Sequence, residues 1–430
     1  MRLRIINGRV IDPANSIDSV QDICIANGVI HAIGPSLGSA SRDFTADREI
    51  DAENQICIPG LVDLSARLRE PGHEHKATIA SETRAAASGG ITTLCCPPDT
   101  APIIDTPAVA SLIRNRAIAA GYAHVVPLGA LTQGLKSEHI SEMAALKEAG
   151  CAGVNNASRH INNAHVLRCA MEYAATQNLT VFLNPEDYWL RNQGCMHEGM
   201  VSTRLGLPGI PESAEIAAVA RDLILIEQTG VRAHFCRLST ARAARMVARA
   251  RYEGLPISAD VSAHHLYLTE MDVSDFNSQC HITPPLRTQR DRDGLRASLA
   301  RGTITAICSD HQPHERDAKL APFSATEPGI SALETLLPLS LRLVDEDILS
   351  LSDTIACLTH QPAKILGIHA GTLSIGANAD ICIFDPNHYW TLTAKTLLSR
   401  GKNTPFMDWE FKGKVTHTLL GGKIVYEWMG

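Results

Sequence analysis

The chain has 430 residues, 39 of them basic and 46 acidic, which gives a formal net charge of −7 with neutral histidines. This mild acidity argues against a global nucleic-acid-binding surface, and 45% apolar residues are enough for a sizeable core. The length suggests two or three domains' worth of chain. The 18 histidines are typical of a metallohydrolase, so their positions become the question.

No apolar stretch is long enough to span a membrane, which would need about 18 residues. The N-terminus, MRLRIINGRVID, is charged and lacks the continuous apolar run of a signal peptide. The 12 cysteines are scattered and none forms a C-x-x-C pair. We therefore expect reduced thiols, a cytoplasmic protein, and neither membrane nor nucleic acid as a partner.

Both ends of the chain have the pattern of short strands. Asn-Gly pairs between apolar residues, at Asn7-Gly8 and Asn27-Gly28, predict hairpins because both residue types tolerate positive φ. A similar segment surrounds Gly421-Gly422. We expect residues 1–58 and 370–430 to pair into one composite β-sandwich domain.

Residues 59–369 alternate between short apolar runs and Ala-rich helical patterns such as Ala164–Gln177 and Ser239–Glu253. About eight such units predict an α/β fold of the (β/α)₈ TIM-barrel type, with functional residues at the carboxyl ends of the strands. The expected strands include Ile56–Val62, Ile91–Cys95, Val125–Leu128, Thr180–Leu183, Ala233–Cys236, Ile257–Val261 and Ile304–Cys308.

The first expected barrel strand ends in Asp63-Leu-Ser-Ala-Arg-Leu-Arg-Glu-Pro-Gly72. This segment resembles the dihydroorotase family of the cyclic amidohydrolase superfamily, which reads D-x-H-x-H-L-R-E-P-G there. The resemblance covers essentially the whole chain. Its other motifs include Gly89–Thr93, Glu198–Pro211, Leu238–Thr240, Ala263–Leu266, Pro284–Thr288, Ser309–His314 and Lys402–Phe406.

The resemblance implies a zinc site, but the family's ligand positions have changed. The positions of four expected histidines hold Ser65, Arg67, Asn184 and Arg237. The bridging acidic residue should fall at 155–157, which reads Asn-Asn-Ala, and only the acidic ligand of the last motif remains, as Asp310.

The chemistry makes this loss decisive. Amide-ring hydrolysis in the family uses a metal-bound hydroxide, and a catalytic metal lowers the pKa of its water from about 15.7 to about 7, or roughly 12 kcal/mol. Guanidinium groups have no acceptor atom and stay charged, so Arg67 and Arg237 cannot hold a cation. We expect no zinc or other cofactor, and Asp310 as a vestige without catalytic activity.

The positions that bind substrate in the family are partly kept. The resemblance assigns this role to Arg69 and His314, which are retained. The family's two asparagines at this site correspond to Asp99 and Thr283, and a carboxylate at position 99 would repel an acidic substrate. We therefore expect a substrate site that has eroded together with the metal site.

The sequence allows two interpretations of Arg67 and Arg237. Arg67 and Arg237 could pair with Asp310, and with Glu186, so that ion pairs replace the metal as the electrostatic link of the centre. Alternatively, both could simply reach the surface.

The remaining histidines favour structural roles. His73 and His75 follow the strand in a loop, and strand alternation would point one of His264 and His265 to the core and the other to the loop. We expect His311 and His314 to form hydrogen bonds within their loop, and His160 and His165 to be loop and helix residues.

The resemblance, with catalysis lost, implies a non-catalytic subunit that assembles with the catalytic chain of aspartate carbamoyltransferase in pyrimidine synthesis. A homodimer within a larger hetero-oligomer, up to a dodecamer, is the family expectation. One rival is an active dihydroorotase, either metal-free with Asp310 as base or with one metal on His264, His311 or His314. Another rival is a sensor that binds a pyrimidine precursor between Arg69 and His314.

Overall fold

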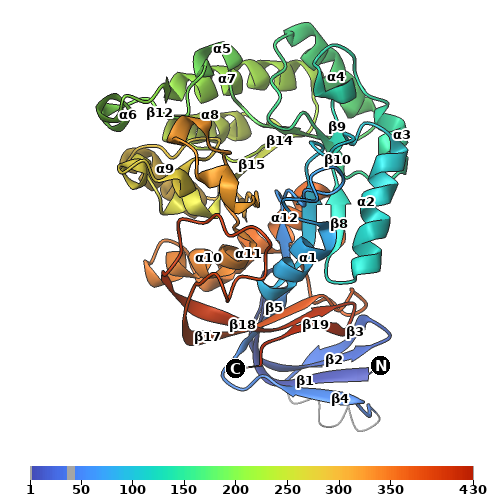
Figure 1. The fold of residues 1–430 in the computed structure, drawn as a ribbon. Coiled ribbons are helices and arrows are strands. Elements are labelled where there is room, and N and C mark those ends of the chain that lie inside the picture. The colour runs from blue at the N-terminus through green and yellow to red at the C-terminus, as the bar shows by residue number, and fades with distance from the viewer. Residues whose placement is uncertain (1, 36–43, 430) are drawn as a thin grey trace.

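The computed structural model describes residues 2–35 and 44–429. It contains a barrel of parallel strands with surrounding helices, and a β-rich layer beneath it that joins the first and last segments of the chain (Figure 1). Among the described residues, no helix is both long and apolar enough to cross a membrane. All 12 cysteines are free thiols.

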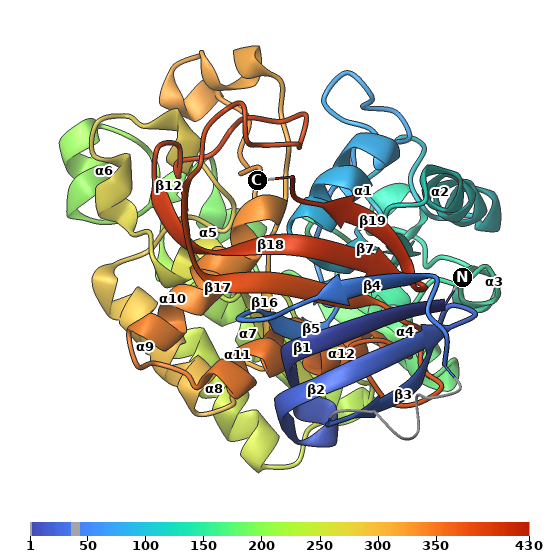
Figure 2. The ribbon, with the colours of Figure 1, turned by 90° about the horizontal axis from the view of Figure 1, so that it is seen from below.

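The lower layer is one hydrogen-bonded sheet with strand order β19-β18-β17-β5-β1-β2-β3, with β4 pairing β1 (Figure 2). Its inward residues, such as Leu3, Ile25 and Ile383, form a core cluster of their own. Both termini therefore contribute to one β structure, as expected. The strands are β1 (Arg2–Asp12), β2 (Ile17–Ala26), β3 (Val29–Gly34), β4 (Arg48–Asp51), β5 (Ile56–Pro59), β17 (Ile381–Thr391), β18 (Glu410–Leu420) and β19 (Lys423–Glu427).

One of the two expected Asn-Gly hairpins is wrong. Asn7 and Gly8 lie inside β1, where the pairing register with β2 shifts and Asn7 has a φ of 62°. A Cβ at Gly8 would come within 2.6 Å of Cys57 Sγ, so the close approach of β5 requires glycine here. The Asn27-Gly28 turn does join β2 to β3, and Gly421-Gly422 joins β18 to β19.

Eight parallel strands, with the short β9 continuing β8, make the barrel. Its ends meet where Ala66 pairs with His311, since Arg67 N donates to His311 O at 2.9 Å and His311 N donates to Ser65 O at 3.1 Å. The barrel thus closes at the carboxyl end of its first strand, beside the vestigial site. The strands are β6 (Leu61–Asp63), β7 (Ile91–Cys96), β8 (His124–Pro127), β9 (Gly129–Ala130), β10 (Gly153–Asn155), β11 (Thr180–Leu183), β14 (Ala233–Phe235), β15 (Ile257–Ser262) and β16 (Ala306–Cys308).

Helices connect the strands, and the two expected helical patterns are confirmed as α4 and α8. Thr240 caps α8 by accepting from Ala243 N at 3.2 Å. Two short strands, β12 (Met196–His197) and β13 (Gly209–Ile210), pair outside the barrel. The α-helices are α1 (Ile79–Ser88), α2 (Pro107–Ala120), α3 (Met143–Glu148), α4 (Ala164–Thr176), α5 (Tyr188–Arg191), α6 (Met200–Leu205), α7 (Glu212–Thr229), α8 (Ala241–Tyr252), α9 (Gln289–Ala300), α10 (Leu336–Asp345), α11 (Leu351–Leu358) and α12 (His360–Leu366).

The expected first barrel strand, Ile56–Val62, is two strands of different sheets. β5 pairs with β1 and β17 of the lower sheet, whereas β6 pairs with β7 of the barrel. The break falls at Gly60, where a Cβ would come within 2.2 Å of the Thr92 side chain. A continuous apolar run hides this change of partner because both strands are buried.

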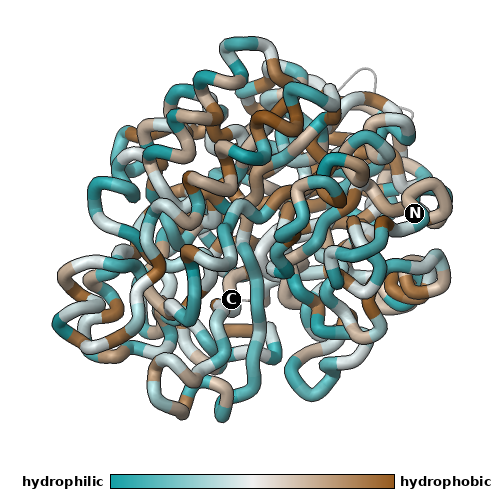
Figure 3. Tube along the Cα trace, turned by 90° about the horizontal axis from the view of Figure 1, so that it is seen from above, coloured by the Kyte–Doolittle hydropathy of each residue, from teal (hydrophilic) through white to brown (hydrophobic). Residues whose placement is uncertain are grey.

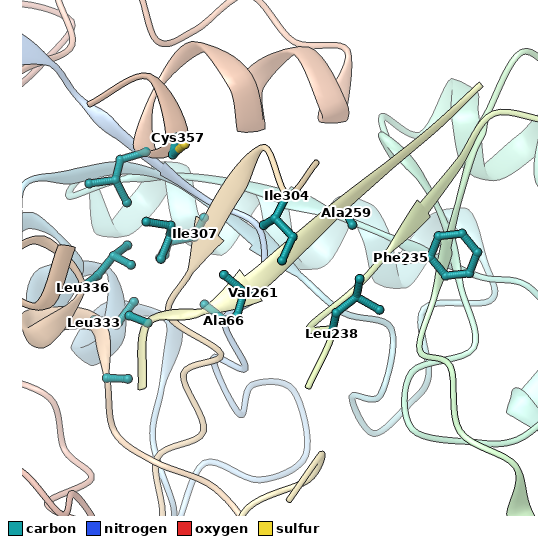
Figure 4. Packing of buried hydrophobic residues seen from close by; sticks show 14 of the residues in the cluster. Ala66, Phe235, Leu238, Ala259, Val261, Ile304, Ile307, Leu333, Leu336 and Cys357 are labelled. Atoms are coloured by element: carbon teal, nitrogen blue, oxygen red, sulfur yellow. The ribbon is translucent and has the colours of Figure 1, made fainter. Parts of the chain in front are cut away.

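The main core fills the space between the barrel and its helices. Val261 and Ile307 from neighbouring strands and Leu336 from α10 pack together, each fully buried (Figure 4). Viewed from above, hydrophobic segments gather toward the interior and many hydrophilic segments lie in the peripheral loops (Figure 3). This packing holds the carboxyl ends of the strands in fixed positions relative to one another.

Candidate functional site

The strand ends bring the altered ligand positions together around Asp310. Arg237 Nη1 donates to Asp310 Oδ1 at 2.7 Å, and Arg67 Nη1 lies 3.6 Å from the same oxygen. All three side chains are buried. The expected pairing of both arginines with Asp310 is therefore present, and the reading in which they reach the surface is wrong.

Asp310 accepts hydrogen bonds at both carboxylate oxygens. Ser65 Oγ donates to its Oδ1 at 3.3 Å, and Gln312 Nε2 lies 3.1 Å from both carboxylate oxygens. Together with Arg237, these donors hold the carboxylate in place by hydrogen bonds and an ion pair. Asp310 is positioned as an acceptor within an ion-pair network.

Asn184 extends the network toward β10. Its Oδ1 accepts from Arg237 Nη2 at 2.8 Å, and its Nδ2 donates to Asn155 Oδ1 at 3.2 Å and to the carbonyl of Ala157. An amide can accept on one side and donate on the other, so Asn184 links the guanidinium of Arg237 to the segment where the family's bridging ligand would be.

Arg67 has a second carboxylate partner that the sequence did not indicate. Its Nε donates to Asp99 Oδ2 at 2.7 Å, and its Nη2 donates to Ser158 Oγ at 3.3 Å. Burial alone would raise the pKa of Asp99, but the charge and hydrogen bond of Arg67, together with the charge of Arg69, hold that pKa below its usual range. Asp99 is thus an anchor for Arg67. Glu186, the other expected partner, instead pairs with Arg191 at 3.3 Å.

Burial and the surrounding charges have opposite effects on the pKa of Arg237. Burial would lower it, but the neighbouring groups, Asp310 first among them, together raise it above its ordinary value. A buried ion pair stabilises little on balance, because desolvation offsets most of the Coulomb attraction. Breaking it is costly, since a charge would remain buried and unpaired.

The retained substrate-binding positions contact each other and the protein. Arg69 Nε donates to Pro313 O at 3.0 Å, and its Nη2 lies 2.9 Å from His314 Nε2. His314 Nδ1 faces Lys76 Nζ at 3.2 Å, and its Nε2 faces Pro328 O at 3.0 Å. Arg69 and Lys76 can only donate and a neutral imidazole accepts at one nitrogen, so His314 accepts from one of the two and holds its proton on the other nitrogen.

Electrostatics agrees with a neutral imidazole at this position. Burial, followed by Arg69 and Lys76, lowers the pKa of His314 to about 2. Burial and the neighbouring Arg67 also lower the pKa of Arg69, to about 10. The Arg69 side chain, which would bind substrate in the family, is thus used in part on Pro313 O and His314.

A small cavity reaches the centre from the side of β11 and β14. It is lined by residues that include Asn184, Arg237 and Thr283, and its volume is about 30 Å³. That is room for about two water molecules, whereas sites for small organic ligands usually measure about 300–1,000 Å³. Thr283, at the position of one of the family's asparagines, lines this cavity.

The residues at the ligand positions do not fit a zinc ion. Zinc sites are built from His nitrogen, Cys sulfur and carboxylate oxygen, and Arg67 and Arg237 offer only N–H donors. The guanidinium of Arg237 occupies the direction from which a cation would approach Asp310. No catalytic step through a metal can be derived from this arrangement.

One other group of described residues has potential ligand atoms within 4.8 Å of one another: His234, Cys236 and Asp260. His234 Nε2 is 2.9 Å from Asp260 Oδ2, and Asp260 Oδ1 accepts from Arg237 N at 2.5 Å. Burial raises the pKa of the Cys236 thiol well above its usual value, so the thiolate that a metal needs is disfavoured. The group is a hydrogen-bonded support beneath Arg237.

The other histidines take structural positions. His264 and His265 are both buried in a 3₁₀ turn, so the expectation that one would face the loop is wrong; strand alternation does not apply after β15 ends. His73 and His75 lie in a loop, His160 in a loop and His165 in α4, as expected. His311 reaches beyond its own loop, with Nε2 2.8 Å from Glu82 Oε2.

Sequence reasoning missed Glu82, Asp260 and Gln312. Glu82 and Asp260 are polar side chains within Ala-rich or apolar segments, which is the signal that could have marked them, whereas Gln312 lies in the polar segment Ser309–His314. Their partners are far away in the chain; for Glu82 and His311 the separation is 229 residues.

Comparisons with known proteins identify the family of this chain. A family model described as "Dihydro-orotase-like" matches residues 54–243, and one described as "Amidohydrolase family" matches residues 214–426. A "Dihydroorotase-like protein" of Pseudomonas putida is 49% identical over 426 residues, covering 99% of both chains. The chain belongs to the dihydroorotase-like family of amidohydrolases.

Other members of this family extend the match. A "Dihydroorotase-like protein" of Pseudomonas aeruginosa is 48% identical over 427 residues, covering 99% of this chain and 100% of that one. A "Dihydroorotase" of Syntrophotalea carbinolica is 42% identical over 426 residues and covers 99% of both chains. The L-hydantoinase structure from Arthrobacter aurescens shares the fold, with a TM-score of 0.88 at 22% identity over 99% of this chain and 96% of that one.

Proposed function

We propose that this dihydroorotase-like chain is catalytically inactive and serves as a non-catalytic subunit that assembles with, and stabilises, aspartate carbamoyltransferase. The observation that carries the loss of catalysis is the pairing of Asp310 with Arg237 and Arg67 at the family's metal position. A metal-bound hydroxide would contribute roughly 12 kcal/mol toward deprotonating water, and no pair of arginines replaces it.

An active dihydroorotase is the second candidate, and the same geometry disfavours it. Asp310 already accepts hydrogen bonds from Ser65, Arg237 and Gln312, so it is not placed to act as a general base. The adjoining cavity of about 30 Å³ is too small for an organic ring. The sensor hypothesis is disfavoured because Arg69 donates to Pro313 O, and because His314 contacts Arg69, Lys76 and Pro328 O within the protein.

The structural role is supported by what the chain retains. The barrel, its closing pair Ala66–His311 and the terminal sheet are complete although the metal ligands are lost. A fold kept without its chemistry is best explained by a use of its surface. The relatives from Pseudomonas near half identity have the name "Dihydroorotase-like protein", while those near 42% have the name "Dihydroorotase".

The test is co-expression with the aspartate carbamoyltransferase catalytic chain of the same organism, followed by purification on a tag carried by this chain. We expect a complex of fixed stoichiometry and higher or longer-lived transferase activity than the catalytic chain has alone. A transferase that is fully active and stable alone, with no co-purification, would refute the assembly. Dihydroorotate turnover with added Zn²⁺ tests the rival, and turnover abolished by Asp310→Ala would establish an enzyme.

A further inference from the structure

A large hollow lies at the opposite end of the barrel from Asp310. It measures about 770 Å³ and lies at the amino ends of β8, β11 and β14, between α2, α3 and α12. This volume falls in the range of sites for small organic ligands, about 300–1,000 Å³. The function proposed above gives no role to this end of the barrel.

The wall of this hollow is basic. Arg114, Lys147, Arg232 and Lys364 line it, together with His124, and none of its 22 lining residues is acidic. The chain as a whole has a net charge of −7. Four cations around one hollow therefore reverse the sign of the charge locally, which would concentrate anions there.

Three of the cations are held in place by neutral acceptors. Arg114 Nη1 donates to Ala149 O at 2.9 Å, and Lys147 Nζ donates to Gln177 O at 2.6 Å. Arg232 Nη2 lies 3.1 Å from Asn178 O and 3.0 Å from Asn178 Oδ1. Carbonyls orient these side chains without cancelling their charge, and each side chain keeps further N–H donors for a ligand.

Asp380 is an acidic residue that contacts the lining. Its Oδ2 lies 3.4 Å from His124 Nε2, while the four lysine and arginine side chains come from other elements. The wall also has apolar side chains, including Ile118, Ile368 and Leu420. A ligand suited to this hollow has several negative charges and a moderate size.

We infer that this basic hollow at the amino end of the barrel binds a small polyphosphate, either bare or carried by a nucleoside. Phosphate oxygens accept charge-assisted hydrogen bonds from lysine and arginine, and the oriented donors of three elements can meet them at once. The inference rests on the hollow and its charges, and it does not depend on the proposed partnership with the transferase.

Isothermal titration calorimetry of the full chain with pyrophosphate, and separately with ADP, tests the site at low ionic strength. We expect saturable binding at one site that weakens as salt is added. The double variant Lys147→Gln/Arg232→Gln should weaken binding by about tenfold or more, because two charge-assisted contacts are lost. Tighter binding of ADP than of pyrophosphate would identify the ligand as a nucleotide, and equal binding would identify the bare polyphosphate chain.

The matched control is Arg245→Gln/Arg249→Gln, which removes two exposed arginines of α8 and changes the net charge equally. It should leave the affinity within about twofold. Lys364→Gln supplies a second cavity variant in which no carbonyl contact is removed, and it should also weaken binding. Absence of saturable binding, or equal weakening by the cavity and control variants, would overturn the inference.

Discussion

Asp310 accepts from Arg237, Ser65 and Gln312, and Arg67 adds a second guanidinium 3.6 Å away. Asp310→Asn keeps the size of this side chain and removes its charge. The two buried guanidiniums then face each other with only Asp99 to balance them. We expect the free energy of unfolding to fall by about 3–5 kcal/mol, measured by urea denaturation.

Asp317→Asn is the control for this variant, because Asp317 is exposed in the loop that follows the same motif. It should change the free energy of unfolding by less than about 0.5 kcal/mol. If Asp310→Asn is equally mild, the ion pairs do not hold the centre together.

His264 gives a pH dependence with a defined sign. Burial, followed by Arg237, lowers its pKa to about 3, and its Nδ1 has no hydrogen-bond partner. Below about pH 6.5 the unfolded chain protonates this histidine while the native state does not, so native stability is lost as the pH falls from about 6.5 toward 3.

His264→Gln should remove one proton from this linkage. The slope of unfolding free energy against pH, measured by urea denaturation between about pH 6 and 4, should become shallower by about 1.4 kcal/mol per pH unit. His75→Gln, at an exposed loop position, should leave the slope unchanged. An unaltered slope in His264→Gln would mean that the native state also protonates His264 in this range.

At the scale of elements, Glu82 joins three segments. It lies on α1 and meets His311 Nε2 at 2.8 Å, Ser399 Oγ at 2.6 Å and Arg400 N at 3.1 Å. Burial would raise the pKa of Glu82, but His311 and the hydrogen bonds from Ser399 and Ser81 together lower that pKa. Glu82 therefore ties α1 to the loop after β16 and to the segment before β18.

Glu82→Ala should leave several buried donors without an acceptor. We expect a loss of about 3 kcal/mol or more in unfolding free energy, and faster amide hydrogen exchange at residues 309–314 and 399–403. Glu53→Ala, at an exposed turn, serves as the control. Exchange that stays as slow as in the parent chain would show that Glu82 does not hold these segments.

The elements also show which parts of the fold are accessible from sequence. The helical patterns in the sequence predicted α4 and α8, because an amphipathic helix is a local feature of the chain. The division of Ile56–Val62 at Gly60 and the bulge at Asn7-Gly8 were missed, because both depend on a strand or side chain that approaches from elsewhere.

The same limit applies to the site. The resemblance to the dihydroorotase motifs located Ser65, Arg67, Asn184, Arg237 and Asp310 at strand ends, and the structure brings them together. The partnership of Arg67 with Asp99 was missed because an acidic residue in a loop has no sequence signal for its partner. Family motifs identify which residues lie at the strand ends of the barrel. The ion-pair partners of these residues depend on the directions of their side chains.

At the scale of the whole molecule, the two ends of the barrel differ. The carboxyl end, the upper centre, is occupied by an ion-pair network, and the amino end, the lower end, has an open basic hollow. The upper centre is held by Arg237, Arg67 and Asp310, and the lower hollow is lined by cations of α2, α3 and α12. This arrangement separates the chain from a metallohydrolase with the same fold, in which the upper end would be open to substrate.

Metal content is the most direct test of this account. The chain, purified without chelators, incubated with excess Zn²⁺ and dialysed, should contain less than about a tenth of a zinc ion per chain by elemental mass spectrometry, because two arginines occupy the cation's place. Near-stoichiometric zinc that survives dialysis and is lost in Asp310→Ala would contradict the account.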